Sequence, residues 1–157
     1  MAKREHHYRV SVEWTGNKGS GTSGYRAYAR DYMIRSGAKP AIPGSSDPAF
    51  LGDVARWNPE DLLVASVSAC HKLWYLHLCA DAGIAVQSYA DEAHGTMVEG
   101  ERSQFTQIVL RPRVAIRASD DPELAKQLHH AAHEQCFIAN SVNFPILCEP
   151  TIEQVGA

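Results

Sequence analysis

The chain has 157 residues, of which 45% are hydrophobic, and its formal net charge is −3. This length and apolar content favour a single domain over residues 1–157, with enough hydrophobic side chains to form a core. Lysines and arginines are interspersed with acidic residues, so there is no basic patch for nucleic acid. The polar start MAKREHH is not followed by an apolar run, which argues against a secretory signal.

The first third of the chain predicts a hairpin and a long loop. Apolar and polar residues alternate over residues 8–14 and again over 25–34, which predicts two strands joined by the turn TGNKGSGTSG. Residues 35–57 contain several prolines and glycines and show neither a helical nor a strand period. They predict a long ordered loop, a kind of segment that often has a function.

Residues 58–83, NPEDLLVASVSACHKLWYLHLCADAG, predict a long central helix. Asn58 can cap its first turn, Pro59 suits the first helical position, and Gly83 ends it. The helix is apolar on nearly all sides, which is typical of a helix enclosed by other layers. Its length would also fit a membrane span, but six polar or charged residues argue against one: Glu60, Asp61, His71, Lys72, His77 and Asp81.

The rest of the chain adds strands and a second helix. Residues 86–98 and 104–117 predict two strands joined by the turn EGERS. A helix is expected to begin after the cap Asp121 and to run to Cys136 or Phe137, and residues 146–155 predict a last strand. This order of elements predicts an α+β fold.

The four cysteines are widely spaced in apolar segments, which favours a reducing compartment, with the cytoplasm as the default. Cys79 and Cys148 are interpreted as inert core residues. Cysteines on apolar helices are more often core residues than nucleophiles, so position alone does not assign a role to Cys70. Because Cys70 lies about three turns inside the helix, a thiolate there would need a nearby cation.

Two other chemistries were weighed. His129, His133 and Cys136 share one helical face, and several more cysteines and histidines could act as metal ligands, namely Cys70, His71, His77, Cys79 and His130. The sequence has no CxxC or HExxH motif, so neither a metal nor a cofactor is expected. A serine hydrolase is excluded, since Ser66 and Ser68 lie inside a helix and no GxSxG motif is present.

The segment NPEDLLVASVSACHKLWYLHLCADAGI, with HEQCFIANSVNFPI some 60 residues later, resembles the OsmC/Ohr family of thiol-dependent hydroperoxide reductases. The resemblance covers most of the chain from Asn58 onward. It implies an OsmC-like fold, in which antiparallel sheets wrap a long central helix in an intertwined homodimer with active sites at the interface. A homodimer would also explain why the central helix is apolar on so many faces.

The resemblance implies roles for individual residues. Cys70 matches the peroxidatic cysteine, which becomes a sulfenic acid, and Cys136 matches the resolving cysteine, which then forms a disulfide with it. Glu60 matches the glutamate that pairs with a catalytic arginine in the family. No arginine occupies the family's positions here, so Arg56 and Arg30 are the candidates. Three aromatic residues could line a pocket for the alkyl part of a peroxide: Trp74, Phe50 and Phe144.

The predicted function is therefore reduction of organic hydroperoxides through a two-cysteine cycle. A dithiol or a lipoylated protein would supply the electrons, the protein would be a homodimer, and neither nucleic acid nor a membrane would be a partner. Two alternatives stay open. A non-catalytic or redox-sensing OsmC-like binding protein is favoured by the absence of a matching arginine, and the second alternative is a Cys/His metal-binding protein.

Overall fold

A computed structural model describes residues 3–156. The chain divides into two compact units, of which the first ends at Leu62 and the second begins at Leu63. The first contains three strands, and the second contains most of the long helix, six strands and the second helix. The expectation of a single domain over residues 1–157 stays a prediction.

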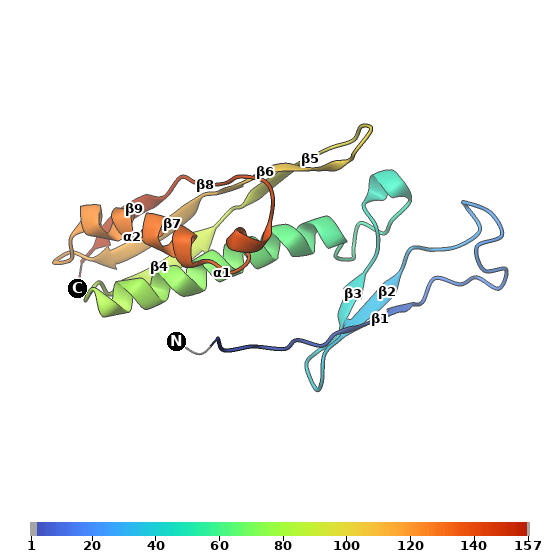
Figure 1. Ribbon diagram of the computed structural model, residues 1–157, viewed down its shortest axis with the longest axis horizontal. Helices are drawn as coiled ribbons and strands as arrows, with labels where there is room; N and C mark the ends of the chain where they lie inside the picture. Colours follow the sequence, from blue (N-terminus) through green and yellow to red (C-terminus); the bar gives the residue numbers. More distant parts are fainter. Residues whose placement is uncertain (1–2, 157) are drawn as a thin grey trace. The chain divides into compact units, whose positions relative to one another are not determined.

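The N-terminal unit is built on a three-stranded antiparallel sheet of β1 (Ser11–Trp14), β2 (Tyr32–Arg35) and β3 (Ile42–Gly44) (Figure 1). Its first pair confirms the predicted hairpin. In its second pair, Tyr32 lies opposite Gly44, where an added Cβ would come 2.1 Å from the Tyr32 ring. The segment 35–57, predicted to be an ordered loop without helix or strand, contains β3 and the 3-10 turn η1 (Pro48–Phe50).

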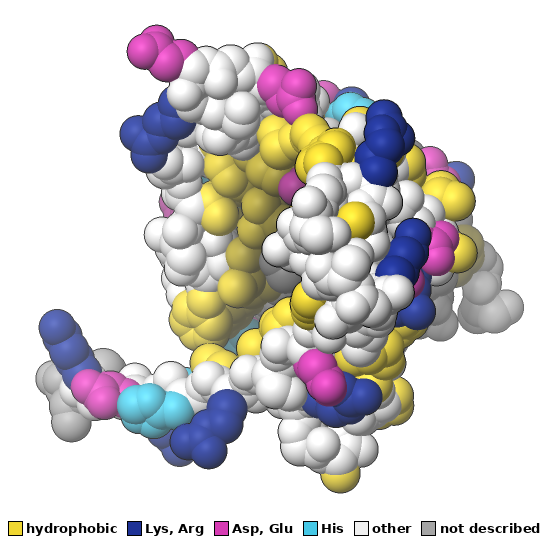
Figure 2. All heavy atoms as spheres, turned by 90° about the vertical axis from the view of Figure 1, so that its right-hand side faces the viewer, with side chains coloured by type: hydrophobic (Ala, Val, Ile, Leu, Met, Phe, Trp, Pro, Cys, Tyr) yellow, Lys and Arg dark blue, Asp and Glu magenta, His cyan; other side chains and the backbone are white. Residues whose placement is uncertain are grey.

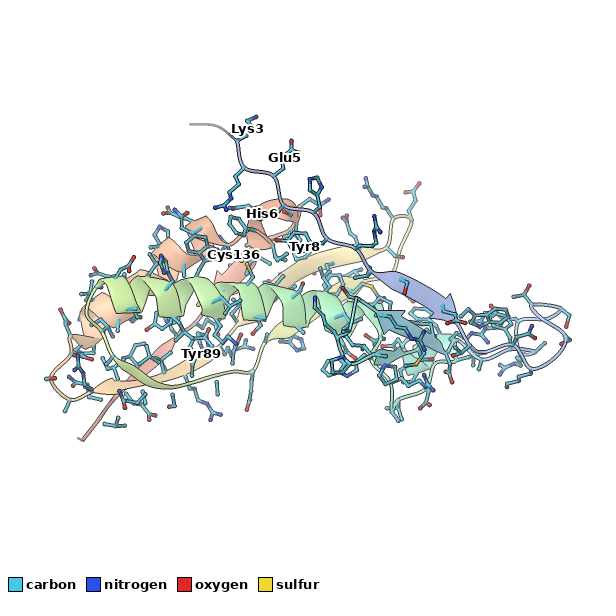
Figure 3. All side chains as sticks on the ribbon, turned by 90° about the horizontal axis from the view of Figure 1, so that it is seen from below. Lys3, Glu5, His6, Tyr8, Tyr89 and Cys136 are labelled. Atoms are coloured by element: carbon cyan, nitrogen blue, oxygen red, sulfur yellow. The ribbon has the colours of Figure 1, made fainter. Side chains whose placement is uncertain are left out.

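The predicted strand over residues 25–34 is wrong for its first part, since β2 begins only at Tyr32. Arg30 explains the difference: its guanidinium donates to the carbonyls of Tyr28 at 2.8 Å and Tyr25 at 2.6 Å and lies over both rings. These carbonyls therefore bond within the loop. The other predicted strand also starts late, because residues 8–10 form an exposed segment before β1, in which Figure 3 labels Tyr8.

Helix α1 (Pro59–Asp81) has the predicted boundaries. The Asn58 side chain accepts from the backbone N–H of Asp61 at 2.7 Å, which satisfies an open amide of the first turn. Gly83 follows the helix with φ +76°, a conformation that favours glycine. One face of α1 is buried in steps of four residues, which are Val67, His71, Tyr75 and Cys79.

The opposite face of α1 is open in the single chain. Ala65, Ala69 and Leu73 are exposed there, Leu73 by 62%. The prediction that other layers enclose the helix therefore holds for one side of it. By length and hydropathy alone α1 could cross a membrane, but the core helices of soluble proteins meet the same criterion.

The C-terminal unit contains two three-stranded sheets. One has the order β4 (Val86–Asp91), β7 (Pro112–Arg117), β9 (Thr151–Val155), and the other has the order β5 (His94–Val98), β6 (Gln104–Leu110), β8 (Ile146–Cys148). The two predicted strands 86–98 and 104–117 form the expected antiparallel hairpin, which divides into β4–β7 and β5–β6.

The division of this hairpin has a local cause. The Asp91 carboxylate accepts from the backbone N–H of Arg111 at 2.7 Å and from the hydroxyl of Ser68 at 2.6 Å. The amide of Arg111 is thus used by a side chain, and Pro112 has no N–H to offer. Both effects interrupt the backbone ladder at the same place.

The expectation of antiparallel sheets is wrong for the last strands. β8 pairs with β6 and β9 pairs with β7, both in parallel, so each sheet is mixed. The physical reason is the long crossover between β7 and β8, because parallel neighbours need a connection of a dozen or more residues. Helix α2 (Pro122–Gln135) lies in this connection.

Helix α2 begins as predicted, with the Asp121 side chain accepting from the backbone N–H groups of Glu123 and Leu124. It ends at Gln135, one residue before the predicted range. Its buried residues pack with α1 and β7 in one hydrophobic cluster, and a second cluster joins α1 to β6 and β8. On the face drawn in Figure 2, basic and acidic side chains are interspersed among exposed hydrophobic ones.

Candidate active site

The Cys70 side chain lies half-buried on α1, in a pocket of about 350 Å³ within the C-terminal unit. The rest of the lining is Leu73, Trp74, His77 and Phe137. The Trp74 ring meets the Phe137 ring edge to face, with centroids 5.5 Å apart. The pocket wall beside the thiol is therefore mostly aromatic and aliphatic, with one imidazole.

Cys136 follows α2 directly and is 1% exposed. Its sulfur accepts from the backbone N–H of Ala139 at 3.4 Å, and Figure 3 labels the residue beside α1. Burial, and next the neighbouring Cys70 thiol, raise the pKa of Cys136 to about 11. The two thiols thus lie close enough to influence each other, and both are free.

The three predicted aromatic residues have different environments. Trp74 lines the Cys70 pocket. Phe144 stacks on Phe105 at 5.6 Å and packs against the second hydrophobic cluster. Phe50 ends η1 in the N-terminal unit and is 38% exposed. Sequence reasoning missed Phe137, although its position directly after Cys136 could have drawn attention to it.

The predicted charged residues lie in the N-terminal unit. Arg56 forms ion pairs with Asp31 at 3.4 Å and Asp53 at 3.8 Å, and Arg30 is held by the two tyrosines described above. Within residues 3–156, the ion pairs of Arg56 do not include Glu60. Burial, and then the Glu60 carboxylate, raise the pKa of Tyr32 in the same unit. The pairing of Glu60 with an arginine therefore stays a prediction.

The structure assembles a cysteine–histidine cluster that shares His71 and His129 with the set weighed in the sequence and adds Cys148. His71 on α1 and His129 on α2 are both buried, with Nε2 of His71 3.0 Å from Nδ1 of His129. The Cys148 sulfur lies 3.7 Å from Nε2 of His71. Burial is the main cause that lowers the pKa of His71 to about 4 and that of His129 to about 3, so both rings are neutral at pH 7.

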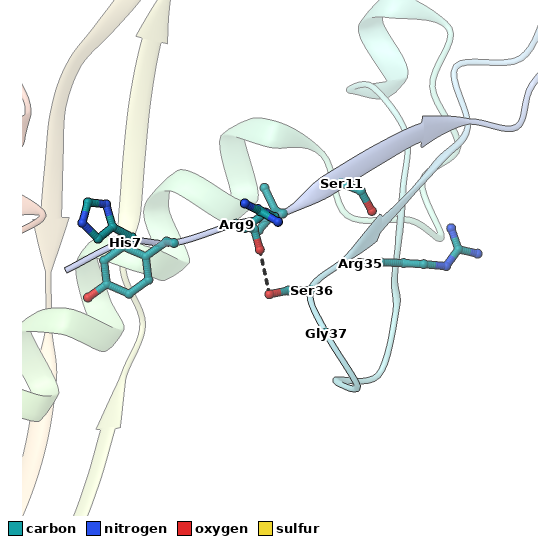
Figure 4. Close-up of a pocket in the computed structure, with 8 residues that line it drawn as sticks. His7, Arg9, Ser11, Arg35, Ser36 and Gly37 are labelled. Carbon is teal, nitrogen blue, oxygen red and sulfur yellow. Dashed lines mark hydrogen bonds between the residues drawn. The ribbon is translucent and has the colours of Figure 1, made fainter.

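Two further observations concern other regions. The hydroxyl of Ser66 donates to the carbonyl of Leu63 at 2.8 Å, which is the helical bond expected of a structural serine. A groove in the N-terminal unit lies along residues 7–11 and 35–37, where the Ser36 hydroxyl donates to the Arg9 carbonyl at 2.9 Å (Figure 4). Among the described residues, its lining includes none of the predicted site residues.

Comparison with known proteins identifies the family of this chain. A family profile described as OsmC-like protein matches residues 52–150. An OsmC-like protein of unknown function from Vibrio cholerae has a similar structure, with a TM-score of 0.86 and 29% identity over 94% of this chain and 100% of that chain. The comparison with curated proteins gave no match.

More distant structures share the fold. An organic hydroperoxide resistance protein OsmC from Legionella pneumophila has a TM-score of 0.67 at 14% identity, covering 96% of this chain and 99% of that chain. The organic hydroperoxide resistance protein OhrB of Bacillus subtilis has a TM-score of 0.61 at 19% identity, covering 94% and 98%. Because the family profile matches more than half of the chain, this protein belongs to the OsmC/Ohr family.

Proposed function

We propose that this protein is an enzyme that reduces organic hydroperoxides with Cys70 as the peroxidatic and Cys136 as the resolving cysteine. The observation that carries the proposal is the proximity of the two free thiols, of which Cys70 opens into an apolar pocket. An apolar wall suits the alkyl part of a peroxide better than it suits hydrogen peroxide. Family membership supports the same chemistry.

The cycle balances with a dithiol as reductant. The Cys70 thiolate attacks the terminal peroxide oxygen, the O–O bond breaks, and the alkoxide leaves as an alcohol after taking a proton. The resulting sulfenic acid condenses with the Cys136 thiol, forming a disulfide and releasing water. The dithiol, free or as the lipoyl group of a protein, then reduces the disulfide and is itself oxidised to a disulfide.

The raised pKa of Cys136 suits the resolving role. A thiol that keeps its proton does not compete with Cys70 for the peroxide, because the thiolate is the nucleophile. When the sulfenic acid forms, the same proton can leave with the departing hydroxide as water. Because Cys136 is buried, its thiol stays protonated while Cys70 reacts with the peroxide, and the two cysteines therefore have different roles.

The test is consumption of cumene hydroperoxide or tert-butyl hydroperoxide under a dithiol, compared with a monothiol. Cys70→Ser should abolish consumption, whereas Cys136→Ser should consume about one equivalent and stop. Cys79→Ser is the matched control, since Cys79 lies on the same helix two and a half turns further on and should not affect turnover. Sustained turnover by Cys70→Ser would refute the proposal.

The cation that favours the Cys70 thiolate is proposed to be Arg56 or Arg30, together with Glu60. An opposite charge within ~4–6 Å favours the charged form of a thiol. Replacing each arginine by alanine and following Cys70 alkylation against pH tests this assignment. An unchanged alkylation midpoint in both variants would exclude both arginines.

The functional unit is proposed to be a homodimer that covers the exposed face of α1. Ala65, Ala69 and Leu73 form an exposed apolar strip opposite the buried face of α1, and an exposed apolar surface of this kind can mark an interface. Leu73→Glu should weaken the dimer in sedimentation, whereas Gln127→Glu on the exposed side of α2 should not. A monomer at micromolar concentration for the unchanged protein would contradict this proposal.

A further inference from the structure

Three possible metal ligands from separate elements converge inside the C-terminal unit. They are Nε2 of His71 on α1, Nδ1 of His129 on α2 and the sulfur of Cys148 at the end of β8, all within 4.8 Å of one another. The proposed peroxide chemistry uses Cys70 and Cys136, and neither of these cysteines belongs to the cluster. The cluster is therefore a separate group of two imidazoles and one thiol, with no part in the two-cysteine cycle.

Packing fixes the positions of these ligands. His71 is 1% exposed and His129 is 2% exposed, and their rings are parallel to within 5°. The ring of Tyr75 stacks on His129 with centroids 3.7 Å apart, and the Tyr75 hydroxyl donates to the carbonyl of Ala125 at 3.1 Å. Ligands placed on helices and held by packing form more precise sites than ligands on loops.

Two of the three distances between the ligand atoms lie close to those expected around a small d10 ion. With metal–nitrogen bonds of ~2.0–2.1 Å and a metal–sulfur bond of ~2.3 Å, tetrahedral angles place two nitrogens ~3.3 Å apart and nitrogen and sulfur ~3.6 Å apart. The observed separations are 3.0 Å between His71 and His129 and 3.7 Å between His71 and Cys148. To admit the ion, the nitrogens must separate by a few tenths of an ångström, and the two rings, which now face each other along their hydrogen bond, must turn so that both lone pairs converge on the metal.

The proton balance of binding is simple. In the metal-free protein one proton lies between the two facing nitrogens and forms their hydrogen bond. Binding moves that proton to the outer nitrogen of the same ring, so both facing nitrogens offer lone pairs. The Cys148 thiol loses its proton to solvent and becomes the thiolate ligand.

Charge and access support the same site. The Asp91 carboxylate, held by Ser68 and the amide of Arg111, lies near enough to act on both His71 and Cys148 electrostatically. One thiolate and this carboxylate would balance a divalent ion. Cys148 also lines a surface pocket, so this ligand of the cluster is accessible from outside.

We propose that His71, His129 and Cys148 bind one d10 transition-metal ion, Zn(II) or Cu(I). Imidazole nitrogen and thiolate sulfur are ligands that both ions accept. Three ligands complete a trigonal Cu(I) site, whereas the neighbouring Asp91 charge favours Zn(II). The two ions are therefore offered separately in the test.

The experiment uses the Cys70→Ser, Cys136→Ser double variant, so that the other cysteine pair cannot hold the metal. Zn(II), or Cu(I) without oxygen, is added, excess is removed by gel filtration, and the retained metal is counted. X-ray absorption then gives the ligand atoms. We expect one equivalent of one of the ions, bound by one sulfur and two nitrogens, to survive competition with a chelator.

Further variants assign the ligands. Adding Cys148→Ser or His129→Asn to the double variant should remove the retained metal, whereas His130→Asn, an exposed histidine on the same helix, should not. Retention of neither ion by the double variant, or retention unchanged by Cys148→Ser, would overturn the proposal. If His129→Asn fails to fold, the number of sulfur and nitrogen ligands that X-ray absorption gives for the double variant still tests the proposal.

Discussion

The reactivity of Cys136 in the folded protein provides a quantitative prediction. Burial and the adjacent Cys70 thiol raise its pKa from the ordinary 9.0 to about 11. At pH 8 the thiolate fraction therefore falls about 100-fold, from roughly a tenth to roughly a thousandth. A thiolate of higher pKa is intrinsically more nucleophilic, which offsets this loss by about sixfold to tenfold. Alkylation of Cys136 should thus be at least about tenfold slower than in the unfolded chain.

The assay is iodoacetamide labelling at pH 8 in the presence of a phosphine reductant, with Cys136 followed by peptide mass spectrometry. The same peptide in urea-unfolded protein provides the reference rate. Cys70→Ala should lower the alkylation midpoint of Cys136 but leave it above the ordinary value, because burial is the larger cause. Equal labelling rates in the folded and unfolded chains would refute the reasoning.

Two further outcomes concern stability. Tyr75→Phe leaves the buried carbonyl of Ala125 without its side-chain donor, so the free energy of unfolding should fall by about 1–2 kcal/mol in urea titrations, and no change would show that the hydrogen bond is not formed. The backbone N–H of Ala85, and then Arg117, lower the pKa of Asp120 below 3.8, so its contribution is complete above pH 3.8 and is lost as pH falls through the folded value. Asp120→Asn should therefore flatten the acid side of the stability curve, and an identical acid profile in the variant would contradict this assignment.

Sequence reasoning succeeded where a structure depends on neighbouring residues. Asn58, Pro59 and Gly83 set the ends of α1 by capping and backbone preference, and Asp121 does the same for the start of α2. The family resemblance named the fold, since the two segments around Cys70 and Cys136 are each specific. Each of these signals is contained in a short stretch of sequence.

Sequence reasoning failed where the local structure depends on residues far apart in the chain or on the contacts of a charged side chain. Arg30 turns the chain back on Tyr25 and Tyr28, so an alternating pattern typical of a strand became a loop. The His71–His129 contact joins residues 58 positions apart, and no periodicity within one helix can predict it. The structure brings His129 together with His71 and Cys148, a grouping that depends on tertiary packing and not on the His129, His133 and Cys136 spacing within α2.

The parallel pairing of β8 and β9 has a consequence for the order of folding. Each is an edge strand of a three-stranded sheet, so before residues 146–155 are synthesised, β5–β6 and β4–β7 are isolated two-stranded ribbons. Such ribbons are marginally stable in water, and their late partners must close long loops. Neither sheet can be completed until residues 146–155 have left the ribosome, so both sheets of the C-terminal unit should form late in folding.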